Sequence, residues 1–432
     1  MTFDASGGLP PATTYHRQPI RILNGVLRAV NALGIARVSF SADELMAKAK
    51  KDTGLSDFGD ERFLEPFRLL CEGLNTEANL NPTGKLLTRM SIMRLLRHRL
   101  LAEELFARHP EILQREIKAP VVVVGLARSG TTRLHRLLAA DSRFLHLKAW
   151  ESVNPVPLPE SFGAGREPRI KSIEDGLKAV LYMSPQIASV HPLGAHEVEE
   201  EVGLIQHAFS SQLFEVQAHL PSFAHYLMSH DQTYAYEYMV RLMKLISWWR
   251  KDDPAKPWVL KTPQHMQDLD ALMRVFPDAR IICSHRDPIK AVGSACSMTW
   301  SAIVRDTDRV DPHWVGREWL AKTDSMLRKT LQVREDTVPA AQQIDVLYQN
   351  ISSDWRSEME RVYRFLDMPL SDEALASMQA WLDSNKQHKH GAHTYRLSDF
   401  GLSKEQVEET LGYYRERFGI PVETRSPHKA SV

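Results

Sequence analysis

The chain has 432 residues, enough to bury a large hydrophobic core, and its length is compatible with two or three domains or with one large α/β domain. Its 54 basic and 54 acidic residues balance, so we expect no general affinity for nucleic acid or for an anionic membrane. Three scattered cysteines do not form the pattern of a disulfide framework or a metal site, which favours a reducing, cytoplasmic compartment. The sequence also contains no signal-peptide pattern and no apolar run near the ~20 residues that span a bilayer.

The first part of the chain, residues 1–118, is predicted to be a helical N-terminal extension. Residues 1–19 are rich in glycine, proline and threonine, which is typical of irregular backbone. From Ile20 to Ile117, apolar residues return every three or four positions, as in amphipathic helices. The arginines between them could bind a polyanion, but glutamates alternate with them, so we favour an ordinary solvated helix face.

Residues 121–133, VVVVGLARSGTTR, combine a buried strand, a glycine-bounded turn and the start of a helix. Unpaired backbone N–H groups at a helix N-terminus bind anions, and Gly125 and Gly130 allow a ligand to approach the chain closely. Nucleotide hydrolases have a lysine after the second glycine of such a loop, where this chain has Thr131. Arg128 is the only cation of this loop, so the sequence predicts an anion site that is not built for ATP with magnesium.

After Pro120 the sequence alternates between short apolar runs and helical stretches. The strand candidates are Val121–Val124, Trp258–Leu260, Arg280–Ser284 and Ile344–Tyr348. Buried strands separated by helices predict an α/β fold, with a P-loop-like parallel sheet flanked by helices over residues 119–432. Residues 151–250 are predicted to be a mostly helical insertion in this domain.

Four polar residues follow or end the strand candidates, namely Arg128, Lys261, Arg286 and Tyr348. Since ligands of parallel sheets bind at the carboxyl ends of the strands, these residues should converge on one edge. Arg286 is followed eight residues later by Ser294 on the next predicted helix, and an arginine with a hydroxyl can make several charge-assisted hydrogen bonds to one phosphate.

The segment R-S-G-T-T resembles the donor-binding loop of sulfotransferases, which move a sulfuryl group from 3′-phosphoadenosine 5′-phosphosulfate (PAPS) to an acceptor. ARIICSHRDPIKAVGSACSM, WVLKTPQH, IDVLYQNI and HGAHTYRLSDFGL also resemble segments of bacterial sulfotransferase-like proteins, from about Pro120 onward. The resemblance implies PAPS as co-substrate and a role in binding it for eight residues: Arg128, Ser129, Gly130, Thr131, Thr132, Arg286, Ser294 and Tyr348.

The same resemblance implies a lysine at the sulfuryl group, which would be Lys261, and Arg128 is a second cation for the charge that develops during transfer. A base must also take the acceptor proton, and we rank Glu151 first, His265 second and His196 third. Glu151 matches the position of the glutamate base of the tyrosylprotein and trehalose sulfotransferases. His265 lies two residues away from the position of the histidine of the phenol and steroid sulfotransferases.

The insertion at 151–250 is the expected place for the acceptor, because it should lie over the sulfate end of the donor. Its aromatic residues either line an apolar acceptor site or form the core of the insertion, and the sequence favours neither interpretation. The candidates are the aromatic residues Phe209, Phe214, Phe223 and Tyr226, together with Met228.

The sequence therefore predicts a sulfotransferase that acts on a small, apolar hydroxyl or amine acceptor. A non-catalytic protein that binds a nucleotide or a sulfated ligand is the alternative, and a P-loop kinase is less favoured because the loop lysine is missing. The stretch HEVEEE has no second histidine at zinc-motif spacing, so we predict no metal. The sequence is also compatible with a homo-oligomer.

Overall fold

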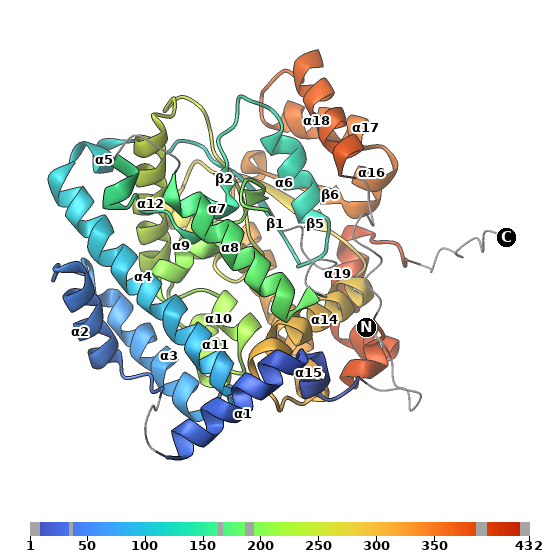
Figure 1. Ribbon diagram of the computed structural model, residues 1–432. Coiled ribbons are helices and arrows are strands. Elements are labelled where there is room, and N and C mark those ends of the chain that lie inside the picture. The colour runs from blue at the N-terminus through green and yellow to red at the C-terminus, as the bar shows by residue number, and fades with distance from the viewer. Residues whose placement is uncertain (1–8, 34–37, 163–166, 186–193, 386–394, 424–432) are drawn as a thin grey trace.

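The computed structural model describes residues 9–33, 38–162, 167–185, 194–385 and 395–423. At its centre is a four-stranded parallel sheet in the order β4-β1-β5-β6, surrounded by helices (Figure 1). The strands are β1 (Val121–Gly125), β4 (Val259–Lys261), β5 (Arg280–His285) and β6 (Gln343–Leu347). Each strand lies within one or two residues of its predicted position, so the α/β fold class is confirmed.

Alternate residues of β1 enter two different hydrophobic cores, one on each face of the sheet. Val121 and Val123 pack in the core that includes Leu137 of helix α6. Val122 and Val124 pack in the larger core on the other face. This alternation follows from the period of two of a strand, and a strand buried on both faces needs apolar residues at every position.

The sheet carries helices before, between and after its strands. Before β1 lie α1 (Gln18–Ala32), α2 (Ala42–Thr53), α3 (Leu64–Thr76), α4 (Pro82–Arg108) and α5 (Glu111–Gln114). Between β1 and β4 lie α6 (Thr131–Ala139), α7 (Ala149–Val153), α8 (Pro168–Met183), α9 (Val202–Ile205), α10 (Leu213–Gln217), α11 (Pro221–Ser229) and α12 (Thr233–Arg250), together with the short strands β2 (Leu147–Lys148) and β3 (Val198–Glu199). After β4 lie α13 (Leu269–Val275), α14 (Pro288–Asp306), α15 (Pro312–Asp336), α16 (Tyr348–Ser353), α17 (Trp355–Phe365), α18 (Asp372–Ser384) and α19 (Lys404–Phe418).

Local signals in the sequence explain where the site-bearing helices begin. Asp287 caps α14 by accepting a hydrogen bond from the N–H of Ile289 at 2.9 Å, and Pro288 occupies the first helical position. Asn81 caps α4 in the same way, accepting from the N–H of Gly84 at 2.8 Å. The cap at Asp287 thus starts α14 directly after the end of β5.

The N-terminal helices and the insertion share one hydrophobic core. Phe67 of α3 packs on Phe209, with ring centroids 4.4 Å apart, and Phe209 stacks in turn on Phe214. Phe209, Phe214, Phe223 and Tyr226 are all buried in this core, which decides between the two interpretations of these aromatic residues in favour of a structural role. The domain boundary at 118/119 stays a prediction.

The arginines of α4 are not all on a solvated face, which is where the sequence interpretation was wrong. The guanidinium of Arg99 is 1 % exposed and lies between the rings of Phe63 and Tyr238, at 4.1 and 4.0 Å from their centroids. It donates hydrogen bonds to the carbonyls of Phe58 and His207, so its polar groups are satisfied by backbone. The cation–π contacts and the backbone acceptors offset the free-energy cost of removing this guanidinium from water.

Across the described ranges, no helix combines the length and the apolar character needed to cross a bilayer. The cytoplasmic location and the homo-oligomer expected from the sequence stay predictions.

Candidate active site

The loop between β1 and α6 has the geometry of an anion cradle. Arg128 and Gly130 have positive φ angles of 70° and 89°, a conformation that costs free energy for arginine and is accessible to glycine. A Cβ at Gly130 would lie 2.5 Å from Cδ2 of Tyr348, so only glycine fits here. No side chain caps α6 at Gly130, which leaves the first N–H groups of the helix directed at the loop.

Ser129 helps to hold this loop in place. Its hydroxyl donates to the carbonyl of Leu126 at 2.7 Å, and its own carbonyl accepts from the hydroxyl of Ser284 at the end of β5, at 2.8 Å. Ser129 is fully buried, so its side chain supports the turn. Its expected part in donor binding would therefore be through the backbone.

The structure brings Arg286 and Ser294 to the same place as Arg128. Nε of Arg128 donates to Oγ of Ser294 at 3.2 Å, and a terminal nitrogen of Arg286 donates to the carbonyl of Arg128 at 2.7 Å. The guanidinium of Arg286 lies 4.0 Å from the ring centroid of Tyr348. Burial, followed by the nearby charge of Arg286, lowers the pKa of Arg128. Two guanidinium groups this close are well suited to bind a dianion.

Lys261 ends β4 and lies against the other end of the loop. Its Nζ is 3.3 Å from Oγ1 of Thr132 and forms an ion pair with Glu200. The residue is only 1 % exposed, and its backbone N–H donates to the carboxylate of Glu201 at 3.0 Å. Thr132, Lys261 and Glu200 thus form a continuous polar contact at the edge of the sheet.

Glu151, ranked first as the base, is a buried structural group in this conformation. Its Oε2 accepts from the N–H of Lys148 at 2.9 Å, which caps α7, and from Arg250 at 3.1 Å. The residue is 1 % exposed, and burial raises the pKa of its carboxyl against the opposing charge of Arg250. Its neighbour Ser152 lines the cavity described below, whereas Glu151 does not.

His265, ranked second, has both ring nitrogens engaged. Its Nε2 pairs with Glu201, and its Nδ1 is 2.9 Å from the hydroxyl of Tyr236 on α12. The ring has no exposure to solvent. A base needs access to the acceptor proton, and this histidine instead links the turn after β4 to α12.

His196, ranked third, is exposed in the turn before β3 and lies outside the cavity lining. The carboxylates that follow it matter more. The two-residue strand β3 pairs with β2 in antiparallel register, Leu147 opposite Glu199, which carries Glu199 and Glu200 to the cavity. Glu200 had no distinguishing signal within the acidic run HEVEEE, and sequence reasoning missed it.

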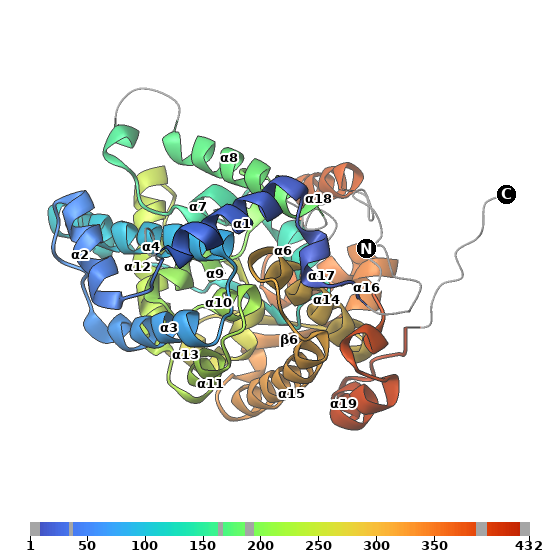
Figure 2. The same ribbon diagram turned by 60° about the horizontal axis from the view of Figure 1, so that its bottom comes forward.

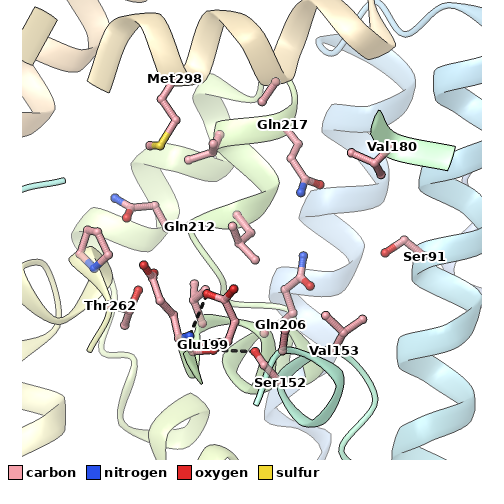
Figure 3. Close-up of a pocket in the computed structure, with 18 of the residues that line it drawn as sticks. Ser91, Ser152, Val153, Val180, Glu199, Gln206, Gln212, Gln217, Thr262 and Met298 are labelled. Carbon is pink, nitrogen blue, oxygen red and sulfur yellow. Dashed lines mark hydrogen bonds between the residues drawn. The ribbon is translucent and has the colours of Figure 1, made fainter. Parts of the chain in front are cut away.

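A cavity of about 1090 Å³ extends away from Thr131, Thr132 and Lys261. Figure 3 shows Thr262 and Glu199 at one end and Ser91 of α4 with Val180 of α8 on the far side. Apolar side chains dominate the far part of the lining. Among them are Leu87, Met90, Leu177, Val180, Leu213 and Met298.

The insertion lines this cavity, and the sequence places the acceptor at the insertion, but the wall from α4 was not expected. The insertion does contribute α8 and α10, but its phenylalanines stay in the core, and α4 of the N-terminal extension supplies a whole wall. α4 also contributes Arg94 to the lining, and burial lowers the pKa of Arg94 to about 10. The cavity is therefore long and apolar, with polar groups at its ends.

Within the described residues, no group of three or more histidine, cysteine, aspartate or glutamate side chains is arranged to hold a metal ion. The segment at residues 390–394, part of the resemblance above, lies outside the described residues.

Comparison with known proteins gives a consistent result. Residues 120–372 match the profile described as the sulfotransferase family. The omega-hydroxy-beta-dihydromenaquinone-9 sulfotransferase Stf3 of Mycobacterium bovis is 24% identical over 322 residues, which cover 71% of this chain and 77% of that protein. The Stf3 of Mycobacterium tuberculosis matches to the same extent.

Two solved structures have closely similar folds. Sulfotransferase STF1 from Mycobacterium tuberculosis superposes with a TM-score of 0.75 at 30% identity, covering 86% of this chain and 98% of that one. Sulfotransferase STF9 from Mycobacterium avium superposes with a TM-score of 0.78 at 27% identity, covering 89% and 98% of the two chains.

Proposed function

This chain belongs to the sulfotransferase family and is a sulfotransferase, and from that premise we propose that it transfers a sulfuryl group from PAPS to the hydroxyl of an elongated, apolar acceptor. The observation that carries the proposal is the cavity that begins at Thr132 and Lys261 and continues between apolar walls. One end offers anion-binding groups and the other offers room for a hydrocarbon body.

The donor half of the proposal is supported by the fit between the loop and two phosphate groups. The uncapped N–H groups of α6, with the hydroxyls of Thr131 and Thr132, would hold the 5′-phosphate. Arg286, Ser294 and Arg128 would hold the 3′-phosphate, since Arg128 contacts Ser294 directly. This gives Arg128 a binding role in place of the role at the sulfuryl oxygens expected from the sequence.

Lys261 is the cation we assign to the transferring group. Its Nζ contacts Thr132 at the donor end of the cavity, so it can neutralise charge on the leaving oxygen as the bond to sulfur breaks. Burial at 1 % exposure strengthens this interaction because water is excluded.

Glu200 is the base we propose, in place of Glu151. Its carboxylate pairs with Lys261 and lines the cavity, so it can accept a proton from an acceptor hydroxyl that enters there. The carboxylate is 17% exposed and can reach a bound acceptor, whereas Glu151 and His265 are enclosed.

The acceptor class is supported by the cavity and by the relative Stf3. That protein is named for a hydroxylated dihydromenaquinone. The apolar lining from α4, α8, α10 and α14 would suit an alcohol with a large hydrocarbon body. An amine acceptor is equally compatible with proton removal by Glu200.

Two measurements test this function. Calorimetry with adenosine 3′,5′-bisphosphate should give tight binding without magnesium, and Arg286→Ala should weaken it by about 2–4 kcal/mol. Equal competition by ATP with a silent Arg286→Ala variant would refute the 3′-phosphate assignment.

Turnover with a panel of apolar alcohols then separates an enzyme acting on such acceptors from a protein that only binds nucleotide. Glu200→Gln should lose about 100-fold or more in turnover while keeping its affinity for the bisphosphate. Glu199→Gln is the matched control, since Glu199 lines the same cavity and its Oε1 accepts a hydrogen bond from the backbone N–H of Glu200 at 2.9 Å. An active Glu200→Gln variant beside an inactive Glu151→Gln variant would return the role of base to Glu151.

A further inference from the structure

Helix α1 faces the rest of the protein with Asn24 and with the half-buried Ile20, Leu27 and Val30. Its one buried residue, in this fully described helix, is Asn24. The side-chain oxygen of Asn24 accepts from the backbone N–H and the hydroxyl of Thr83, at 2.9 and 2.7 Å, which ties α1 to the first turn of α4. A buried asparagine with two hydrogen bonds fixes the rotation of the helix about its axis.

A second set of apolar residues on α1 points away from the protein. Ile22, Val26, Ala29 and Leu33 recur at spacings of four, three and four residues, on the side opposite Asn24. Ile22, Val26 and Leu33 are 60%, 55% and 74% exposed. An amphipathic helix of a globular protein normally turns such a stripe inward, so this orientation marks an interaction surface.

The charged residues of α1 itself are all basic, and one of them, Arg28, forms an ion pair with Asp308. The helix and its N-cap carry Arg17, Arg21 and Arg28 and no acidic residue. Beside it lies a groove of about 610 Å³ whose lining includes Arg28, Lys85 and Arg309, with Asp308 as its one carboxylate. Because the whole chain has no net charge, the excess of basic residues on α1 and in this groove is specific to that part of the surface. Such a surface complements anionic groups.

This apolar face continues to the mouth of the acceptor cavity. Leu86 and Met90 of α4 line the cavity and are also 43% and 60% exposed, so they stand at its opening. They lie one and two turns beyond Thr83, the residue to which α1 is tied. At the other side, Arg17 lies 4.6 Å from the ring of Tyr182 on α8. Figure 2 shows α1 near both α4 and α8.

We propose that α1 binds an anionic lipid bilayer, with Ile22, Val26 and Leu33 at the boundary between headgroups and acyl chains. The acceptor would then pass from the bilayer along Leu86 and Met90 into the cavity without crossing water. Helices of this kind lie on a membrane and do not span it. The part of this inference that concerns the acceptor rests on the proposed function, whereas the binding of α1 to lipid does not.

A second copy of the chain is the competing occupant of this surface. Arg21 and Arg28 lie three and four residues from Asn24, so they flank the protein-facing side of α1 and would not meet if two α1 helices packed face to face. The groove beside α1 also carries Lys85 and Arg309, and a second α1 has no acidic residue to pair with them, whereas anionic headgroups attract them. This positive groove favours the bilayer.

The test is sedimentation of the full chain with vesicles. Wild-type protein should bind phosphatidylcholine vesicles that contain about 30% phosphatidylglycerol far better than vesicles of phosphatidylcholine alone. The double variant Ile22→Asp, Val26→Asp should bind the anionic vesicles at least about tenfold more weakly. Leu113→Asp on α5 is the matched control, since Leu113 is 37% exposed and apolar but lies away from α1, and it should bind like wild type.

Equal vesicle binding by the double variant, or no binding by wild type, would overturn the proposal. Loss of a wild-type dimer in the double variant, seen by analytical ultracentrifugation without vesicles, would assign the surface to a second copy instead. Unchanged affinity for adenosine 3′,5′-bisphosphate verifies that the variant is folded.

Activity separates this inference from the proposed function. The double variant should keep wild-type turnover of a short, water-soluble alcohol and lose at least about tenfold with an apolar alcohol embedded in vesicles. A wild-type protein that binds vesicles but sulfates neither alcohol contradicts the proposed function and leaves the lipid surface standing. Equal losses on both alcohols would contradict the route from the bilayer.

Discussion

Arg286 and Glu423 form a two-point ion pair, with N–O distances of 2.7 and 2.9 Å, across the place where we propose that the 3′-phosphate binds. Glu423 is held there by its own backbone, whose N–H donates to Asp287 at 2.8 Å. The carboxylate therefore satisfies the guanidinium group in the absence of a ligand. A phosphate that binds Arg286 must compete with it.

Glu423→Gln should consequently bind adenosine 3′,5′-bisphosphate about three- to tenfold more tightly than wild type, because the competing charge is gone. Calorimetry measures this, and Glu409→Gln, an exposed position on α19, serves as the control. Weaker binding by Glu423→Gln would mean that the glutamate orients Arg286 for the ligand.

The left-handed glycine of the anion cradle gives a second prediction. Gly130→Ala should lose at least about tenfold in bisphosphate affinity and about 1–3 kcal/mol in the free energy of unfolding, through strain and the contact with Tyr348. Gly54→Ala is a matched control, since Gly54 has a φ of 71° but nothing within 4 Å of an added Cβ. That control should lose stability and keep its ligand affinity. Equal affinity in both variants would remove Gly130 from the donor site.

Gly176 on α8 allows the acceptor cavity to be filled without disturbing its walls. An added Cβ at this cavity-lining position meets nothing within 4 Å. Gly176→Phe should raise KM for an apolar acceptor about tenfold or more while leaving bisphosphate affinity unchanged. Gly176→Ala controls for the change in helix propensity, worth about 1 kcal/mol of stability, and should keep a wild-type KM. An unchanged KM in Gly176→Phe would put the acceptor elsewhere.

The Asp268 carboxyl should make stability depend on pH. It is fully buried and accepts one hydrogen bond from Gln264 at 3.0 Å, and burial raises its pKa from 3.8 to about 7. Between these values the unfolded chain has released the proton and the folded chain keeps it, so this group's contribution to stability falls as pH rises towards 7.

The free energy of unfolding of Asp268→Asn should therefore rise relative to that of wild type between about pH 4 and pH 7, by at most about 1.4 kcal/mol per pH unit. Above that range the difference between the two proteins should level off. Urea unfolding across that range measures it, with Asp383→Asn, an exposed position on α18, as the control. Parallel curves for wild type and Asp268→Asn would contradict the raised pKa.

The sheet and the donor edge could be predicted because their signals are local. A run of valines such as Val121–Val124 has few alternatives to a buried strand, and the order of the motifs was enough to bring Arg128, Lys261 and Arg286 together. The spacing from Arg286 to Ser294 on the start of α14 also follows from nearby residues alone.

The candidate base could not be predicted in the same way. Glu200 follows a strand of two residues, too short for any periodic pattern, and only the pairing of β3 with β2 brings it to Lys261. His265 lies close to Lys261 in sequence, yet its enclosure depends on Tyr236 and Glu201, which come from distant segments. Hydrophobic side chains give no sequence signal that separates a core position from a cavity wall, as Phe209 illustrates.

Helix α4 precedes the region that matches the family profile, yet it supplies Leu87, Met90 and Arg94 to the acceptor cavity. The phosphate loop and the lysine that we propose for the transfer are thus encoded in one stretch of the gene, and one wall of the proposed acceptor site in another. On this proposal, substitutions in α4 should change the acceptor preference while leaving the transfer chemistry intact. A chimera that joins residues 1–118 of one such enzyme to the remainder of another should inherit part of its acceptor preference from the shorter piece.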